Sequence, residues 1–138
     1  MWWIYALLSA LFASLTAIFA KVGVKGIDSD LATAIRTVVV LIIAWGMVFF
    51  KGGASAVSTL TQKNMFYLII SGIATGLSWI FYFKALQTGN VSQVAPVDKL
   101  SLALTILLSV IFLNEVLTLK IVIGVILIMI GAFIIVQS

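Results

Sequence analysis

The sequence contains no cysteine and no histidine among its 138 residues. Without cysteine there is no disulfide framework, and without thiolates and imidazoles the usual ligands of zinc are missing. The same absences remove most of the nucleophile–base pairs that enzymes use in covalent catalysis. Because the four acids are also scattered along the chain, we expect no metal site, no cofactor and no enzymatic activity.

Charge is scarce as well, with eight Lys and Arg residues against four Asp and Glu residues. Hydrophobic residues make up 64% of the chain, and the mean hydropathy is +1.32. A soluble domain of this size does not need so much apolar surface, so the lipid bilayer is the expected solvent. The net charge of +4 is spread over loops and helix ends, which argues against a nucleic-acid partner.

Five long apolar runs predict five membrane-spanning helices. They cover residues 3–22, 31–50, 65–87, 91–113 and 118–136. Irregular backbone cannot face lipid, so the expected fold class is all-α, an integral membrane bundle of five transmembrane helices. We expect a multi-pass protein of the cell inner (plasma) membrane, with its two termini on opposite sides.

Proline occurs once, at Pro96, and it lies inside the fourth apolar run. A proline within a helix leaves the carbonyl four residues back, that of Ser92, without its usual donor and tends to kink the helix. Asp98 and Lys99 follow directly, and charges at membrane depth are costly unless they serve a purpose. Asp98 is therefore the strongest candidate for a protonatable coupling site, with a static ion pair to Lys99 or Arg36 as the rival interpretation.

Polar residues form stripes on two of the predicted helices, because their spacing of three and four places them on one helix face. Two interpretations remain open for these stripes: the hydroxyl groups line a polar path, or they bond back to carbonyls of their own helix. Arg36 likewise either extends to the nearer interface or faces a polar cavity. The residues that we expect along a substrate or ion pathway are Asp98, Lys99, Arg36, Ser71, Thr75, Ser78, Trp79, Tyr82, Ser101, Thr105 and Pro96.

Lysines are balanced between the two sides of the predicted topology. Lys51, Lys63 and Lys120 lie on the side of the N-terminus, and Lys21, Lys25 and Lys84 lie on the other. Orientation follows the excess of positive charge on one side, and here there is no clear excess. The chain is therefore either inserted both ways round, giving antiparallel pairs, or held in one orientation by other features.

Several segments in order along the chain carry a family resemblance. They are Lys21-Val-Gly-Val-Lys-Gly-Ile-Asp28, Arg36, Tyr82-Phe-Lys-Ala-Leu-Gln-Thr-Gly-Asn-Val-Ser-Gln-Val-Ala-Pro96, Phe112-Leu-Asn-Glu115 and Gly124-Val-Ile-Leu-Ile-Met-Ile-Gly131. With them the chain resembles a single EamA-type unit of the drug/metabolite transporter superfamily, which implies one EamA-like transmembrane domain over residues 1–138. Larger members join two such units in inverted orientation and move small metabolites. The small multidrug resistance proteins are similar and work as antiparallel dimers, but they use an acid in their first helix, which this chain lacks.

The resemblance implies a secondary transporter of a small metabolite or drug-like compound. Because the chain has half the repeats of the larger relatives, we expect an antiparallel homodimer with alternating access. Gly124 and Gly131 lie seven residues apart on one face of the fifth predicted helix and would let two copies approach closely. The alternative is a non-transporting accessory subunit that pairs with another membrane protein.

Overall fold

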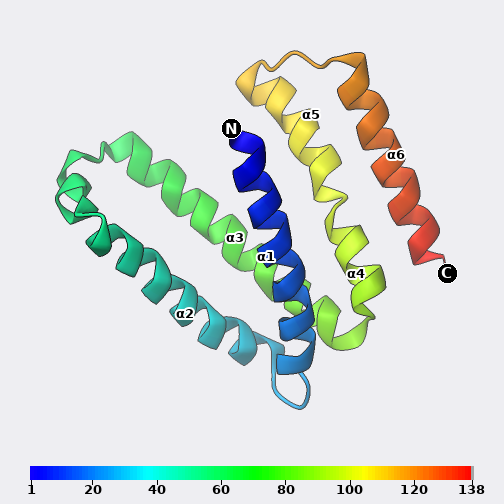
Figure 1. The fold of residues 1–138 in the computed structure, drawn as a ribbon, viewed down its shortest axis with the longest axis horizontal. Coiled ribbons are helices and arrows are strands. Elements are labelled where there is room, and N and C mark those ends of the chain that lie inside the picture. Colours follow the sequence, from blue (N-terminus) through cyan, green and yellow to red (C-terminus); the bar gives the residue numbers. More distant parts are fainter. Residues whose placement is uncertain (138) are drawn as a thin grey trace. The chain divides into compact units, whose positions relative to one another are not determined.

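The computed structural model describes residues 1–137, with Ala54 described by its backbone alone, and Ser138, the last residue of the predicted domain, lies outside them. All regular secondary structure in these residues is helical, which confirms the all-α class. The elements are α1 (Trp2–Gly23), α2 (Ser29–Phe50), the 3-10 helix η1 (Gly53–Thr59), α3 (Gln62–Thr88), α4 (Val91–Asp98), α5 (Ser101–Leu113) and α6 (Leu119–Val136) (Figure 1).

Five segments of the described chain have the length and apolarity to cross a membrane. They are Trp2–Gly23, Ser29–Phe50, Gln62–Thr88, Val91–Leu113 and Leu119–Val136. Buried apolar side chains in residues 1–137 are few, namely Ala17, Val24, Phe83, Leu86 and Ala132. Large apolar side chains point outward along every helix, as expected of helices whose outer faces meet lipid.

Polar caps set two helix starts that differ from the predicted ones. The carboxylate of Asp28 accepts hydrogen bonds from the backbone N–H groups of Asp30 and Leu31, at 2.9 and 3.1 Å, so α2 begins at residue 29 rather than 31. The hydroxyl of Thr61 accepts from the N–H of Asn64 at 3.2 Å, and α3 begins at residue 62 rather than 65. Hydropathy cannot detect these starts, because a capped first turn is polar.

Between the second and third predicted spans the chain forms a short 3-10 helix, η1. Gly52 adopts a positive φ of 68°, and its N–H donates to the carbonyl of Phe49 at 3.0 Å. This left-handed residue ends α2, as glycine commonly does because it lacks a Cβ. The chain then forms η1 before it enters α3.

The fourth span was predicted as one kinked helix, but the structure divides it into two. α4 ends at Asp98 and α5 begins at Ser101. At the break the backbone bonds to the third residue back: the N–H of Lys99 donates to Pro96 at 3.1 Å, and the N–H of Leu100 donates to Val97 at 2.9 Å. The ladder thus leaves α-helical register three and four residues after Pro96, whose own missing N–H affects the carbonyl of Ser92 instead.

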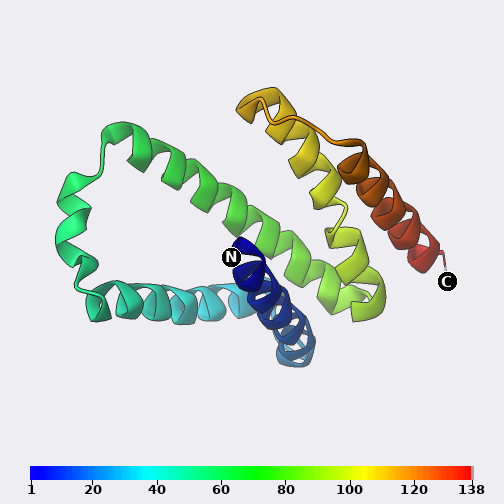
Figure 2. The same cartoon turned by 45° about the horizontal axis from the view of Figure 1, so that its top comes forward.

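The described chain forms two compact units. One consists of residues 19–87, where the connection between α1 and α2 is tied to the end of α3. The Lys21 ammonium donates to the carbonyl of Leu86, and the Gln87 side-chain amide donates to the carbonyl of Ile27 at 2.8 Å. Val24 and Leu86 are almost fully buried there. α2 and α3 converge at this tied end and diverge toward η1, as Figure 1 and Figure 2 both show.

The other unit combines Met1–Ile18 with the described residues from Thr88 onward. Within it α6 runs beside α4 and α5, as both views show (Figures 1 and 2). An open apolar pocket lies between them. Val97 and Leu100, on either side of the helix break, face Met129 and Phe133 of α6 across this pocket. The helix break is therefore packed against the C-terminal half of α6.

Candidate functional site

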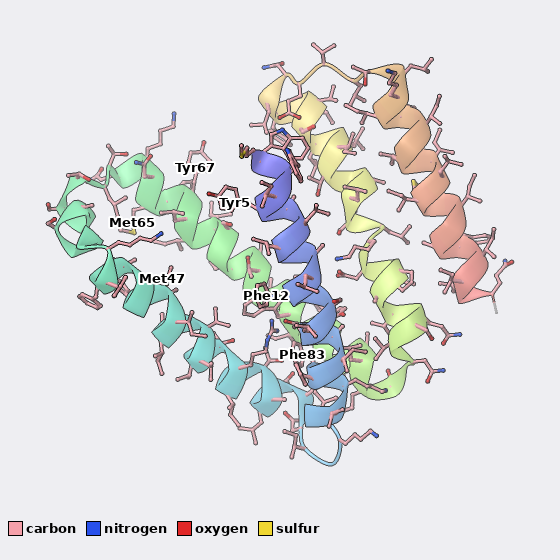
Figure 3. All side chains as sticks on the ribbon, in the orientation of Figure 1. Tyr5, Phe12, Met47, Met65, Tyr67 and Phe83 are labelled. Atoms are coloured by element: carbon pink, nitrogen blue, oxygen red, sulfur yellow. The ribbon has the colours of Figure 1, made fainter. Side chains whose placement is uncertain are left out.

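Arg36 lies against α3 within the unit of residues 19–87. Its guanidinium carbon is 4.5 Å from the ring centroid of Trp79 and 4.9 Å from that of Phe83. Phe83 is only 2% exposed and lies near the end where α2 and α3 converge (Figure 3). Two cation–π contacts therefore hold the guanidinium of Arg36, which lies in the second turn of α2. Arg36 thus contacts aromatic rings of α3, and its place in a polar cavity stays a prediction.

The Arg36 guanidinium has no hydrogen-bond or ion-pair partner within residues 19–87. The hydroxyl groups of Thr33 and Thr37 donate to carbonyls of their own helix, those of Ser29 and Thr33, each at 2.8 Å. The rings of Trp79 and Phe83 attract the positive charge but offer no lone pair to its N–H groups, and Tyr82 interacts with the guanidinium electrostatically. Within residues 19–87, no hydrogen bond therefore occupies the donors of this arginine.

The polar stripe of α3 divides into two parts. Thr75 donates to the carbonyl of Ser71 at 2.8 Å, which is the intrahelical bond named as one of the two open interpretations of the stripe. Ser71, Thr75 and Ser78 are exposed, whereas Trp79 and Tyr82 are partly buried. The structure thus brings the aromatic end of the stripe together with Arg36 and leaves the hydroxyl end on an outer face.

Asp98 and Lys99 form an ion pair at the helix break of the other unit. The Lys99 ammonium is 3.4 Å from a carboxylate oxygen of Asp98, and the Lys99 and Asp98 side chains are 62% and 37% exposed. Strong charge-assisted bonds between such groups measure about 2.7–2.9 Å, so this pair is loose. The Asp98 carboxylate retains lone pairs for a proton or a ligand.

The remaining predicted residues surround the break or lie on α6. Pro96 is partly buried in α4, two residues before Asp98, and Ser101 and Thr105 are exposed on α5. A Cβ placed on Gly124 or Gly131 would meet no atom within 4 Å. Packing within one chain therefore does not require glycine at either position.

Sequence reasoning missed Phe83 as a member of the Arg36 cluster. Phe83 follows Trp79 by four residues, so both rings project from the same face of α3. That spacing is present in the sequence, but a phenylalanine in an apolar span carries no polar signal, unlike the hydroxyl residues of the same spacing.

No group of three or more acidic, histidine or cysteine side chains suited to holding a metal ion is found in residues 1–137. Each compact unit of the described chain thus contains one of the two candidate polar sites. One is an arginine on aromatic rings, and the other is an acid–base pair at a broken membrane-spanning segment.

Comparison with known proteins identifies the family. The EamA-like transporter family matches residues 1–137. A Sinorhizobium protein named "Uncharacterized transporter in cobO 3'region" is 47% identical over 131 residues, which cover 95% of this chain and 93% of the relative. An uncharacterised protein of Methanocaldococcus jannaschii is 40% identical over 70 residues, 51% of each chain. No solved structure matches. With a family match over nearly its whole length and five apolar spans, the chain belongs to the EamA-like transporter family and is a multi-pass membrane transporter.

Proposed function

We propose that the protein is a secondary transporter of a small metabolite or drug-like compound. The observation that carries this proposal is the break in the fourth span, where Pro96, Asp98 and Lys99 interrupt a segment long enough to cross the membrane. Discontinuous helices with charged groups and free carbonyls at mid-membrane are the usual substrate and ion sites of secondary transporters. The inner (plasma) membrane is the proposed location.

Alternating access requires two halves that move against each other, and one five-helix chain supplies one half. We therefore propose an antiparallel homodimer, each chain contributing its single transmembrane domain. Gly124 and Gly131 support an interface on α6, because small residues allow close helix approach and neither is needed for packing within the chain. The likeness to small multidrug resistance proteins stays a prediction of the sequence.

The pathway of this transporter is proposed to include both polar places. At the break it uses Asp98, Lys99 and Pro96, followed by Ser101 and Thr105 on α5. On the other unit it uses Arg36 with Trp79 and Tyr82, followed by Ser71, Thr75 and Ser78 toward the far end of α3. The contacts of Arg36 and the loose Asp98–Lys99 pair support this assignment, since each leaves polar groups available to a ligand.

The test is reconstitution of the purified protein in liposomes. Small metabolites are screened for uptake with and without a pH gradient, against protein-free liposomes of the same lipid. We expect uptake above the protein-free background for at least one compound, enhanced by the gradient if protons are the coupling ion. If a folded, correctly inserted protein moves none of the compounds, the accessory-subunit function is favoured, and a partner must be sought by cross-linking in native membranes.

A further inference from the structure

Arg36 is a charged group whose two ring contacts supply attraction but no hydrogen bond. Within residues 19–87 its ring contacts are with Trp79 and Phe83, Tyr82 interacts with it electrostatically, and none of its five N–H groups makes a hydrogen bond there. We propose that Arg36 binds an oxyanion, a carboxylate or phosphate group. We take this oxyanion to be the anionic group of the transported compound, so its assignment rests on the proposed function. An acidic lipid headgroup would present the same chemistry.

The geometry suits an oxyanion better than a neutral ligand. A guanidinium offers its N–H groups as a planar fork that matches two oxygens of a carboxylate or phosphate. The two ring contacts restrict the position of the side chain, so less conformational freedom is lost when a ligand binds. Trp79 and Phe83 also surround the charge with apolar surface, which strengthens an ionic contact relative to water.

The acids of the same unit are not placed to fill this role. Asp28 uses its carboxylate to cap α2. Asp30 lies in the exposed first turn of α2, six residues before Arg36, and six residues correspond to about 9 Å of helix rise. Six residues also turn the helix by about 240°, which places Asp30 and Arg36 on different faces. Neither acid is paired with Arg36.

Trp79 provides a direct probe, because an anion at Arg36 changes the charge next to its ring. The full chain with Trp2, Trp3 and Trp45 replaced by Phe keeps Trp79 as its single tryptophan. In phosphatidylcholine vesicles, inorganic phosphate and acetate are titrated against chloride at equal ionic strength. A second series uses vesicles that also contain phosphatidylglycerol. We expect a saturable change in Trp79 emission with phosphate or acetate.

Three variants of this single-tryptophan chain test the role of Arg36. Arg36→Gln should weaken the anion response by about ten- to hundredfold, the value of charge-assisted hydrogen bonds to one guanidinium. Arg36→Lys keeps the charge but loses the planar fork, so an intermediate loss is expected, and it serves if Arg36→Gln does not fold. Lys25→Gln removes an exposed cation of the connecting loop without touching the rings, and it should bind as the parent does.

The proposal is overturned if neither anion changes Trp79 emission in folded protein, or if Arg36→Gln and Arg36→Lys respond like the parent. If Trp79 emission changes only in the vesicles that contain phosphatidylglycerol, and not with phosphate or acetate in phosphatidylcholine alone, the site binds a lipid headgroup. That result overturns its assignment to the transported compound. Binding is measured here without flux, so the two proposals can fail separately. Transport without an Arg36-dependent response refutes the anion site alone, and a response without transport refutes the transporter alone.

Discussion

At the scale of single residues, the charged side chains of the two candidate sites, Arg36 and Asp98, have different neighbours. Arg36 is held by ring faces that take no hydrogen bond, whereas Asp98 has an ammonium neighbour on the next residue of the chain. Contacts with the Trp79 and Phe83 rings use none of the conventional hydrogen bonds of the arginine. A loose pair leaves a carboxylate that can exchange its partner for a proton. The first arrangement suits ligand binding, and the second suits coupling.

Asp98→Asn tests the coupling role. We expect a folded protein in which gradient-driven uptake falls to the protein-free background while substrate exchange persists, because the amide cannot take up and release a proton. Uptake and exchange are measured in the same liposomes, and folding is followed by size-exclusion chromatography. Glu115→Gln is the matched control, since Glu115 lies beyond the end of α5 and should not affect uptake.

A purely structural ion pair gives a different result for the same substitution. Losing the carboxylate would then leave an unpaired cation in the membrane, and the protein would fold poorly until that cation is also neutralised. Rescue of Asp98→Asn by Lys99→Gln would identify the structural pair. Full pH-dependent transport by Asp98→Asn would refute both roles.

Arg36 and Asp98 were recognised from the sequence because a charged residue within an apolar run is conspicuous. The neighbours of these residues could not be predicted, because the contact of Arg36 with two rings depends on how α2 packs against α3. Phe83 shows the limit most clearly: it looks like any lipid-facing phenylalanine until the tied end of α3 buries it. The Asp98–Lys99 contact was also uncertain, because helical geometry separates neighbours by about 100°. Lys99 keeps helical backbone angles, so the contact at 3.4 Å depends on the side-chain conformations of the two residues.

At the scale of elements, hydropathy located all five spans, and the differences arise where polar groups act on the backbone. The caps at Asp28 and Thr61 lengthen two helices beyond their apolar parts. Pro96 indicated a kink, but a kink and a full break have the same sequence signal. The break forms because the backbone at Lys99 and Leu100 takes tighter hydrogen bonds than an α-helix does.

Gly124→Leu and Gly131→Leu test the proposed interface on α6. Each position has open space within the chain, so a leucine should not disturb insertion. Across a close helix pair it would overpack the contact at a cost of about 1–3 kcal/mol, which corresponds to roughly five- to hundredfold weaker association. Dimer content is measured by cross-linking in liposomes, together with transport.

Gly46→Leu is the matched control for these substitutions. Gly46 lies within α2 and is equally free of neighbours, so it reports the effect of the larger side chain on insertion alone. An unchanged dimer in both α6 variants would move the interface elsewhere. The face of α3 with Gly72 and Gly76, which also have open space around them, would then be examined in the same way.

At the scale of the whole molecule, the sequence leaves orientation undecided because three lysines flank each side. Two single-cysteine variants test whether both orientations occur, since the chain has no native cysteine. Ala56→Cys labels η1, and Ile27→Cys labels the connection at the other end of α2. With dual insertion, a membrane-impermeant thiol reagent should modify about half of the molecules in each variant, because each site then faces outward in one orientation of two.

The two labelling sites, at Ala56 and Ile27, serve as controls for each other. Complete labelling of one variant and none of the other would show a single orientation and rule out an antiparallel dimer, while leaving the five-helix topology intact. Complete labelling of both variants would contradict the topology itself, because successive ends of one membrane-spanning helix must lie on opposite sides.

The tied end of α2 and α3 has a mechanical consequence. Two long rods joined firmly at one end act as lever arms about that pivot. α3 is 27 residues long, about 40 Å at helical rise, so a rotation of about 5° would carry its far end through about 3.5 Å. Arg36 lies about 10 Å from the start of α2, where the same rotation shifts the backbone by less than about 1 Å. The ends of α2 and α3 near η1 could thus move by several ångströms while the backbone at Arg36 stays almost in place.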